Sequence, residues 1–420
     1  MASVDATTGQ AARSLQPIAF ALLAPALLLA TTSVHADDKP AARTEIGALP
    51  LLGGDSDLGF GGGALMSLTR VEPGSEPYRW QLELSAVVTF KRPDTGWQMP
   101  YQDAYVLLNV PNLIRDRLRL ELRPSYTREL NQAYYGIGNA TPAPEHGPAG
   151  QPSIDYFQFE RVHPTLSVRF LFKLGGSFYL QLGNSLTYNA IEVHPGSKLD
   201  IDRHDPRLRS FFGTLRPHFV DFFEYTLFYD TRDNEVSPLR GMYHQVRLRL
   251  SPGGTDPLPY RYGQVNATAR FYVTPVHRWL TIAARVVGDV LFGDPPFYEL
   301  ARFEDTFALG GVRGVRGVPG QRYYGKIKLF GNLESRSELT SFSLFGLPCT
   351  LSGVLFIDAG RLWSDWHADP ELDGHGLGLK LGLGGGLRLQ QGTAFVVRGD
   401  LAWSPDARPI GAYVTAGQIF

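Results

Sequence analysis

Apolar and polar residues alternate along many long stretches of this chain. In segment 118–123, leucines occupy every second position, and arginine and glutamate occupy the positions between them. Successive side chains of an extended strand point to opposite faces, so each such stretch predicts a strand with one apolar and one polar face. The pattern recurs at 81–87, 246–250, 377–384 and 395–403. This periodicity favours a fold made of strands.

Strand length and loop length separate two sheet architectures, a soluble sandwich and a membrane barrel. Most predicted strands exceed the roughly five to six residues typical of globular sheets. Long connections (129–153, 194–209, 294–324) alternate with short ones such as 174–175 and 390–392. Short turns on one rim and long loops on the other are typical of outer-membrane barrels, and closure leaves no unpaired strand edge in lipid.

We therefore predict an all-β fold, a 16-stranded antiparallel transmembrane β-barrel of the outer-membrane type, over residues 45–420. The connection 294–324 is expected to fold into its lumen. The strands are expected at 45–52, 57–70, 77–90, 101–110, 114–127, 155–172, 176–193, 213–230, 241–252, 261–274, 278–293, 325–340, 349–363, 376–390, 393–404 and 410–420.

The first 36 residues have the pattern of a secretory signal peptide. An early Arg13 precedes an apolar stretch at 18–30, and small residues at 34–36 provide a cleavage site. A transmembrane anchor is the weaker alternative, because spanning a bilayer takes roughly 20 apolar residues. We expect residues 1–36 to be removed on export and residues 37–44 to form a short periplasmic linker.

Charge and motif content exclude several function classes. The formal net charge is −1, which gives no basis for nucleic-acid binding. The single cysteine, Cys349, forms no internal disulfide, and the chain carries no catalytic nucleophile motif and no metal-ligand spacing. We therefore expect no enzyme activity, no cofactor and no metal site.

A glycine-rich run at 309–318, Leu-Gly-Gly-Val-Arg-Gly-Val-Arg-Gly-Val, carries the candidate site residues. It lies in the connection 294–324 and is followed by Glu334 and Asp358 on the next two predicted strands. Both acids are assigned to the lumen, since a carboxylate facing lipid is costly. An arginine of an inward-folded loop can form forked hydrogen bonds with them. The alternative, that the arginines of the run are simply solvated, stays open.

Together these segments resemble the barrel core of the bacterial outer-membrane assembly-factor and surface-antigen superfamily, the BamA/TamA-like barrels. That family carries a Val-Arg-Gly-aromatic motif in the loop before its twelfth strand. The resemblance aligns Arg316 with the motif arginine and the two acids with its partners; Val318 replaces the aromatic residue, and Arg313 offers a competing register. The implied site is Gly310, Gly311, Val315, Arg316, Gly317, Glu334 and Asp358, with a secondary motif of Asp230, Arg232, Asp233, Pro238 and Gly241.

The resemblance implies a barrel of the bacterial outer membrane that assists insertion or translocation of polypeptides, or of lipids. It implies a weak seam between first and last strands, where glycines reduce side-chain packing: Gly53, Gly54, Gly411 and Gly417. The implied partners are outer-membrane lipid, a client polypeptide and a separate periplasmic helper protein. Residues 37–44 leave no room for the family's periplasmic repeats, so a barrel lacking POTRA domains is expected.

Two other functions remain as alternatives. A barrel of this size conducts ions as a passive pore if its lumen is not filled. A surface adhesin or antigen would instead use its long outer loops, above all 129–153.

Overall fold

The structure is a computed structural model. It describes residues 42–420 except 56–57, 74, 76–77, 93–95, 115–116, 142–155, 277–278, 305–306, 345–346 and 392–394. The expected signal peptide, 1–36, and residues 37–41 of the expected linker lie outside the described residues. The last two residues of that linker belong to the first strand, which begins at Arg43.

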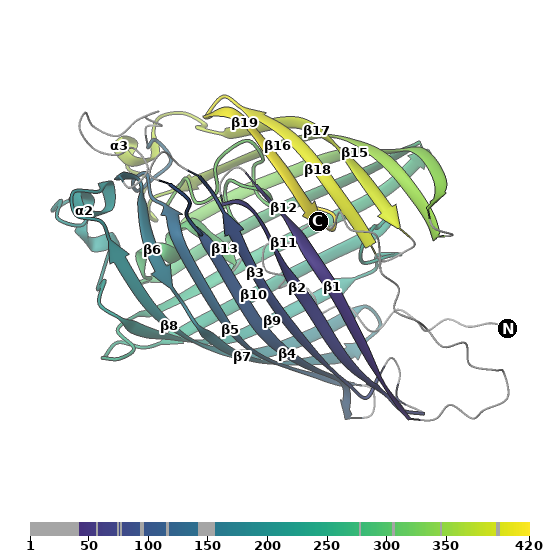
Figure 1. Ribbon diagram of the computed structural model, residues 1–420. Helices are drawn as coiled ribbons and strands as arrows, with labels where there is room; N and C mark the ends of the chain where they lie inside the picture. Colours follow the sequence, from purple (N-terminus) through teal and green to yellow (C-terminus); the bar gives the residue numbers. More distant parts are fainter. Residues whose placement is uncertain are drawn as a thin grey trace, which may run out of the picture.

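One antiparallel sheet closes on itself as a barrel (Figure 1). Both β6 and β7 pair with β5 and with β8, so they form one bent strand and the barrel has 16 positions. Pairing of β1 with β19 closes the ring. This confirms the predicted fold class.

The strand bounds follow the predicted order closely. They are β1 (Arg43–Asp55), β2 (Gly59–Val71), β3 (Trp80–Phe90), β4 (Tyr101–Ile114), β5 (Leu118–Ala133), β6 (Gln158–Val162), β7 (Thr165–Gly175), β8 (Phe178–Val193), β9 (His218–Asp230), β10 (Gly241–Pro252), β11 (Arg261–Val276), β12 (Leu280–Gly293), β15 (Ile327–Leu344), β16 (Leu347–Trp363), β17 (Lys380–Gln391), β18 (Phe395–Ser404) and β19 (Ala407–Ala416).

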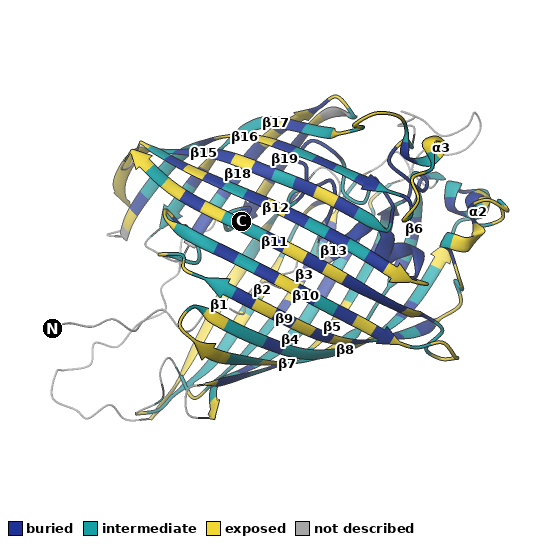
Figure 2. Cartoon of the chain, turned by 180° about the vertical axis from the view of Figure 1, so that it is seen from behind, coloured by how far each residue is buried: buried dark blue, intermediate teal, exposed yellow. Residues whose placement is uncertain are grey.

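Buried and exposed residues alternate along the strands (Figure 2). On β9, for example, Glu224 and Thr226 are buried in the lumen, whereas Tyr225 and Leu227 are exposed on the outer surface. The exposed side chains of the wall are largely apolar, which suits contact with acyl chains. The period-2 pattern therefore separates a lumen face from a lipid face.

Two predicted strands differ from the observed ones. The strand expected at 155–172 bends at His163 and Pro164, because proline has no N–H to donate to the ladder. The last strand, expected to reach residue 420, ends at Ala416. Gly417 then adopts a φ of +81°, and the buried residues Ile419 and Phe420 pack against Tyr272 and Ala283.

The long connections carry the remaining elements and meet at one rim. These elements are α2 (Lys198–Asp202), η1 (Arg209–Phe211), η2 (Phe297–Ala301), the small hairpin β13 (Arg302–Glu304) and β14 (Phe307–Ala308), and α3 (Pro370–Asp373). Both α2 and α3 lie at the same end of the barrel in Figure 1. Among the described residues, no helix is long and apolar enough to cross a membrane.

An apolar cluster joins these loops into an outer cap. Tyr134 of the loop after β5 packs with Phe212, with Phe297 of η2 and with Tyr324. Tyr134 also donates a hydrogen bond to Asp202 over 2.9 Å, and the Gly138 N–H donates to the Tyr324 carbonyl over 2.7 Å. The cap therefore ties three long loops together above the lumen.

Candidate functional site

The connection between β12 and β15, residues 294–326, enters the lumen, and we name it the inward segment. Its apolar residues Leu309, Val315 and Val318 are buried with Phe330 and Leu362 of the barrel wall. Val318, which replaces the family's aromatic residue, is fully buried in this cluster. This part of the segment therefore packs against β15 and β16.

Arg316 of the inward segment lies between three carboxylates in the lumen. Its Nη1 donates to Glu334 Oε1 over 2.7 Å, and its Nε and Nη2 donate to the two oxygens of Asp358 over 2.8 and 3.0 Å. Nη1 also lies 3.3 Å from Asp400 Oδ2. We call these four residues the Arg316 cluster; all four side chains have 0% exposure.

Burial and hydrogen bonding act in opposite directions on Arg316. Burial alone lowers the pKa of the guanidinium, but the hydrogen bond to Asp358 and the charges of Glu334 and Asp400 raise that pKa above its ordinary value. The guanidinium carbon also lies 3.3 Å from the centroid of the Phe356 ring, within cation–π distance. Arg316 is thus a charged guanidinium that contacts three carboxylates and one aromatic ring.

Further polar residues of the wall hold the carboxylates in place. Arg336 donates to Glu334 over 2.8 Å, Arg388 donates to Asp400 over 2.6 Å, and Asn332 donates to Asp358 over 2.7 Å. These partners come from β15 and β17, so the wall itself holds each carboxylate independently of the inward segment. Such a pre-arranged acidic site suits one guanidinium.

Two glycines let the inward segment approach the wall closely. Gly317 has a φ of +91°, which L side chains rarely adopt, and its N–H donates to the Tyr413 hydroxyl over 3.0 Å. A Cβ at Gly382 of β17 would lie 2.1 Å from the Arg316 carbonyl oxygen. The motif turn is closed by the Gly311 N–H, which donates to the Val318 carbonyl, and by a bridge between Gly310 and Val315.

The structure also decides between the two candidate arginines. Arg316, and not Arg313, lies between Glu334 and Asp358. The Arg313 carbonyl accepts a hydrogen bond from Arg285, and its side chain lines a separate cavity. Sequence reasoning did not include Asp400 or Tyr413 in the site. The polar phase of the strand at 393–404 was the available signal for Asp400.

The secondary motif forms a self-contained turn between β9 and β10, away from the Arg316 cluster. Arg232 donates to both oxygens of Asp230, over 2.9 and 2.6 Å. Asp233 accepts hydrogen bonds from the backbone N–H groups of residues 239 and 240, which directly follow Pro238. Gly241 has a φ of +101°, and a Cβ there would lie 2.3 Å from the Thr231 carbonyl oxygen. These contacts shape the turn and touch no other described element of the site.

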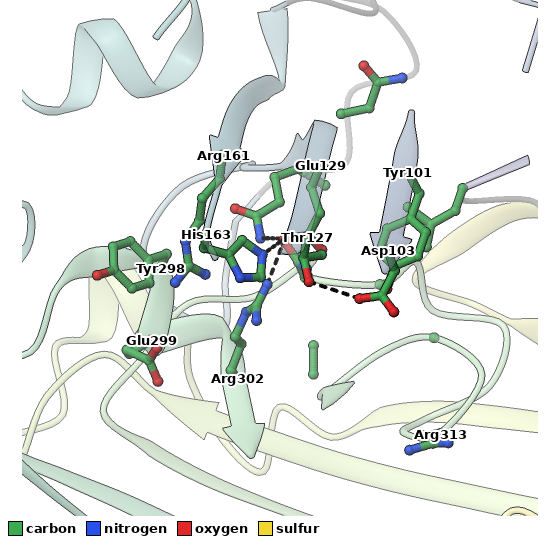
Figure 3. Close-up of a pocket in the computed structure, with 18 of the residues that line it drawn as sticks. Tyr101, Asp103, Thr127, Glu129, Arg161, His163, Tyr298, Glu299, Arg302 and Arg313 are labelled. Carbon is green, nitrogen blue, oxygen red and sulfur yellow. Dashed lines mark hydrogen bonds and ion pairs between the residues drawn. The ribbon is translucent and has the colours of Figure 1, made fainter. Parts of the chain in front are cut away.

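A polar cavity of about 470 Å³ remains on the other side of the inward segment. Hydroxyl and charged side chains from β4 to β8 line it, and so do Arg302 and Arg313 of the segment (Figure 3). Among the described residues, no group of three His, Cys, Asp or Glu side chains is placed to hold a metal ion.

The seam between β1 and β19 is short. Only Gly54 and Asp55 of β1 pair with β19, opposite Val414 and Tyr413, whereas all 13 residues of β1 pair with β2. β19 ends at Ala416, and the chain then turns inward. There Arg285 donates to the Ile419 carbonyl over 3.3 Å.

Comparisons with known proteins agree with this architecture. A family model described as the Omp85 superfamily domain matches residues 109–420. BamA from Haemophilus ducreyi lacking POTRA domains 1-3 is similar in structure, with a TM-score of 0.60 and 12% identity over 90% of this chain and 71% of that one. None of the curated proteins compared matches in sequence.

Two CdiB structures are also similar. CdiB from Escherichia coli has a TM-score of 0.54 and 13% identity, over 90% of this chain and 64% of that one. CdiB from Acinetobacter baumannii has a TM-score of 0.51 and 11% identity, over 89% and 59%. This chain therefore spans less than two thirds of the length of either CdiB chain, and at these identities the likeness shows the fold alone.

Proposed function

Because this chain belongs to the Omp85 superfamily, we propose that its barrel assists the insertion or translocation of client polypeptides at the outer membrane. Members of that superfamily are transport and assembly barrels rather than enzymes. The chain is accordingly a non-enzymatic barrel of the bacterial outer membrane, with its outer face in contact with lipid.

The short seam is the observation that carries the proposal. Among the described residues, β1 has no strand partner on its outer edge from Arg43 to Gly53. An unpaired edge presents backbone N–H and C=O groups, which an incoming extended segment can pair with by strand addition. Among the described residues, two residue pairs join β1 to β19, so little pairing has to break when the seam opens.

Tyr413 connects the seam to the Arg316 cluster. It lies on β19, pairs with Asp55 across the seam, and accepts the hydrogen bond from the Gly317 N–H. In the proposed mechanism the inward segment stays bound to β15–β18 while β1 and β19 separate. The Arg316 cluster then preserves the shape of the C-terminal half of the barrel during opening.

The passive pore is the rival function, and the polar cavity of about 470 Å³ is the observation that favours it. The inward segment and the outer cap oppose it, since both occupy the path through the lumen. Much of the loop invoked for an adhesin, from residue 142 to 153, lies outside the described residues. A separate periplasmic helper remains part of the proposal as a partner.

The test is client folding by the purified barrel in liposomes. A small urea-denatured outer-membrane barrel is added, and its folding is followed by gel mobility against liposomes without protein. We expect faster client folding with the wild type, and loss of the acceleration when β1 and β19 are joined by an engineered crosslink. Equal rates with crosslinked and free seams would contradict the proposal, and a large steady current without acceleration would favour the pore.

A further inference from the structure

The inward segment is also bound to the opposite wall of the barrel, through Arg302. This residue follows η2, and its Nη2 donates to Glu129 Oε2 on β5 over 2.8 Å (Figure 3). Both side chains are about 10% exposed. The contact is therefore a buried ion pair between the inward segment and the wall.

Other wall residues orient the Glu129 carboxylate. Gln132 donates to the same Oε2 over 2.6 Å, and the His163 ring nitrogen Nε2 lies 3.1 Å from it. We call Glu129, Gln132, His163 and Arg302 the Glu129 cluster. Three of its members belong to the wall and only Arg302 belongs to the inward segment, so the wall presents a fixed acceptor to one cation.

A second contact reinforces this attachment. The guanidinium of Arg161 stacks 3.6 Å from the ring centroid of Tyr298 in η2, and two of its nitrogens donate to Asn189 of β8. The Tyr298 hydroxyl also lies 2.9 Å from His218 Nε2 of β9. Residues 298 and 302 are thus bound by side chains from β5 to β9.

The two attachments lie on opposite sides of the ring. β5 is the fifth barrel position, whereas β15 and β16 are the twelfth and thirteenth of 16. Glu129 is therefore seven positions from Glu334 and eight from Asp358, close to half of the circumference. Phe303, directly after Arg302, packs with Val287 of β12 and with Phe330 of β15, and its carbonyl accepts hydrogen bonds from β11. The Arg302 side chain therefore reaches from that side of the lumen to Glu129 on the other.

We propose that Glu129 is a positioning residue, the second anchor of the inward segment, on the wall opposite Glu334 and Asp358. Arg302 bound to Glu129 holds one end, and Arg316 bound to Glu334 and Asp358 holds the other. With both anchors present the segment divides the lumen and limits passage. With the Glu129 anchor lost, the segment stays attached around Arg316 and Phe303, but the bridge from Arg302 to β5 is lost, and the lumen opens. This inference rests on the proposed role of the inward segment and requires no client.

The test uses Glu129→Gln, Arg302→Gln and the double variant in the full barrel. Each single variant leaves one charge of the buried pair without its partner, whereas the double variant removes both charges of the pair. We expect each single variant to lower the temperature of barrel unfolding on gels, and the double variant to recover most of that loss. All three should show at least a several-fold higher single-channel current in planar bilayers than the wild type.

An anchor is identified when the double variant recovers the unfolding temperature but keeps the raised current. A merely structural ion pair would return current and unfolding temperature to wild-type values together in the double variant. The matched control is Asp103→Asn, which removes another buried carboxylate of the same cavity. Asp103 accepts a hydrogen bond from Thr127 of the wall (Figure 3). This variant should keep the wild-type current.

Three results would overturn the inference. They are a wild-type current in the double variant, an equal rise in current with Asp103→Asn, and failure of both single and double variants to assemble while Asp103→Asn assembles. The last would show that Glu129 is needed to form the wall. Client folding is measured separately, so a barrel that conducts as expected but never accelerates folding would contradict the proposed function and leave the anchor standing.

Discussion

The two walls of the lumen bind the same segment in different ways. On the side of β15–β18 the inward segment is closely packed. Arg316 is fully buried there, and the Arg316 carbonyl lies against Gly382. Toward β4–β9 a polar cavity remains, and the segment is held at its end by Arg302 and Tyr298. The C-terminal wall therefore acts as a docking surface, and the N-terminal wall acts as a tether beside a water-accessible space.

This difference predicts on which wall a substitution should destabilise the barrel more. Charges that meet in the fully buried Arg316 cluster depend on one another, because removing one leaves the others uncompensated in a low-dielectric interior. Side chains that line the cavity can exchange protein partners for water. Comparable chemical changes should therefore cost much more on the C-terminal wall than on the N-terminal wall.

Arg316→Ala should give the largest effect. It removes the cation that Glu334 and Asp358 share, and losing one partner of a buried ion pair typically costs about 3 to 5 kcal/mol. Urea unfolding of the purified barrel in detergent micelles measures this loss. Arg207→Ala, which removes an exposed arginine paired with Glu371, is the control and should leave the unfolding midpoint unchanged. Equal midpoints for both variants would break the comparison between walls.

Asp400→Asn should have the next largest effect. Two carboxylates still hold Arg316, but Arg388 loses a charged acceptor at 2.6 Å. Hydrogen bonds to charged groups typically contribute about 1.5 to 3 kcal/mol, so a loss of that size is expected in the same urea titration. A double-mutant cycle with Arg388→Gln measures the coupling. Additive losses would mean that Asp400 does not work with Arg388.

Gly382→Ala should destabilise the docking of the inward segment. Its new Cβ would meet the Arg316 carbonyl oxygen, and overpacking of this kind typically costs about 1 to 3 kcal/mol. Gly399→Ala on β18 is the matched control, because a Cβ there has open space. Limited proteolysis of the folded barrel should cut the inward segment faster only in the Gly382 variant. Similar cleavage of both variants would count against close docking.

Ser185→Leu tests the N-terminal wall and should have the smallest effect. Ser185 lines the cavity, where there is room for added carbon atoms, so a change within about 0.5 kcal/mol is expected. The same urea titration provides the measurement. A loss as large as that of Gly382→Ala would show that the cavity does not relax around new bulk.

Local periodicity predicted much of the architecture. The alternation gave the number and order of the strands, and it assigned Glu334 and Asp358 to the face that the structure places in the lumen. This prediction succeeded because successive strand residues point to opposite faces of the sheet, so the face of each residue follows from its position along the strand. The signal peptide at 1–36 and most of the linker at 37–44 lie outside the described residues, so both stay predictions.

Contacts between distant segments could not be predicted in this way. Sequence spacing left Arg313 and Arg316 equivalent, and it gave no reason to connect Arg302 with Glu129. It also placed Phe420 on a strand, although the chain leaves the wall after Ala416. These features depend on which strands become neighbours on closure and on the path of one segment through the lumen.

The amino-acid sequence by itself determined a ladder of two-faced strands and the polar side of each strand, because strand geometry is local. Only the tertiary structure decided which guanidinium reaches which carboxylate and how few residues join β1 to β19. Those choices are settled by closure of the ring, which brings residues far apart in the chain within a few ångströms of one another.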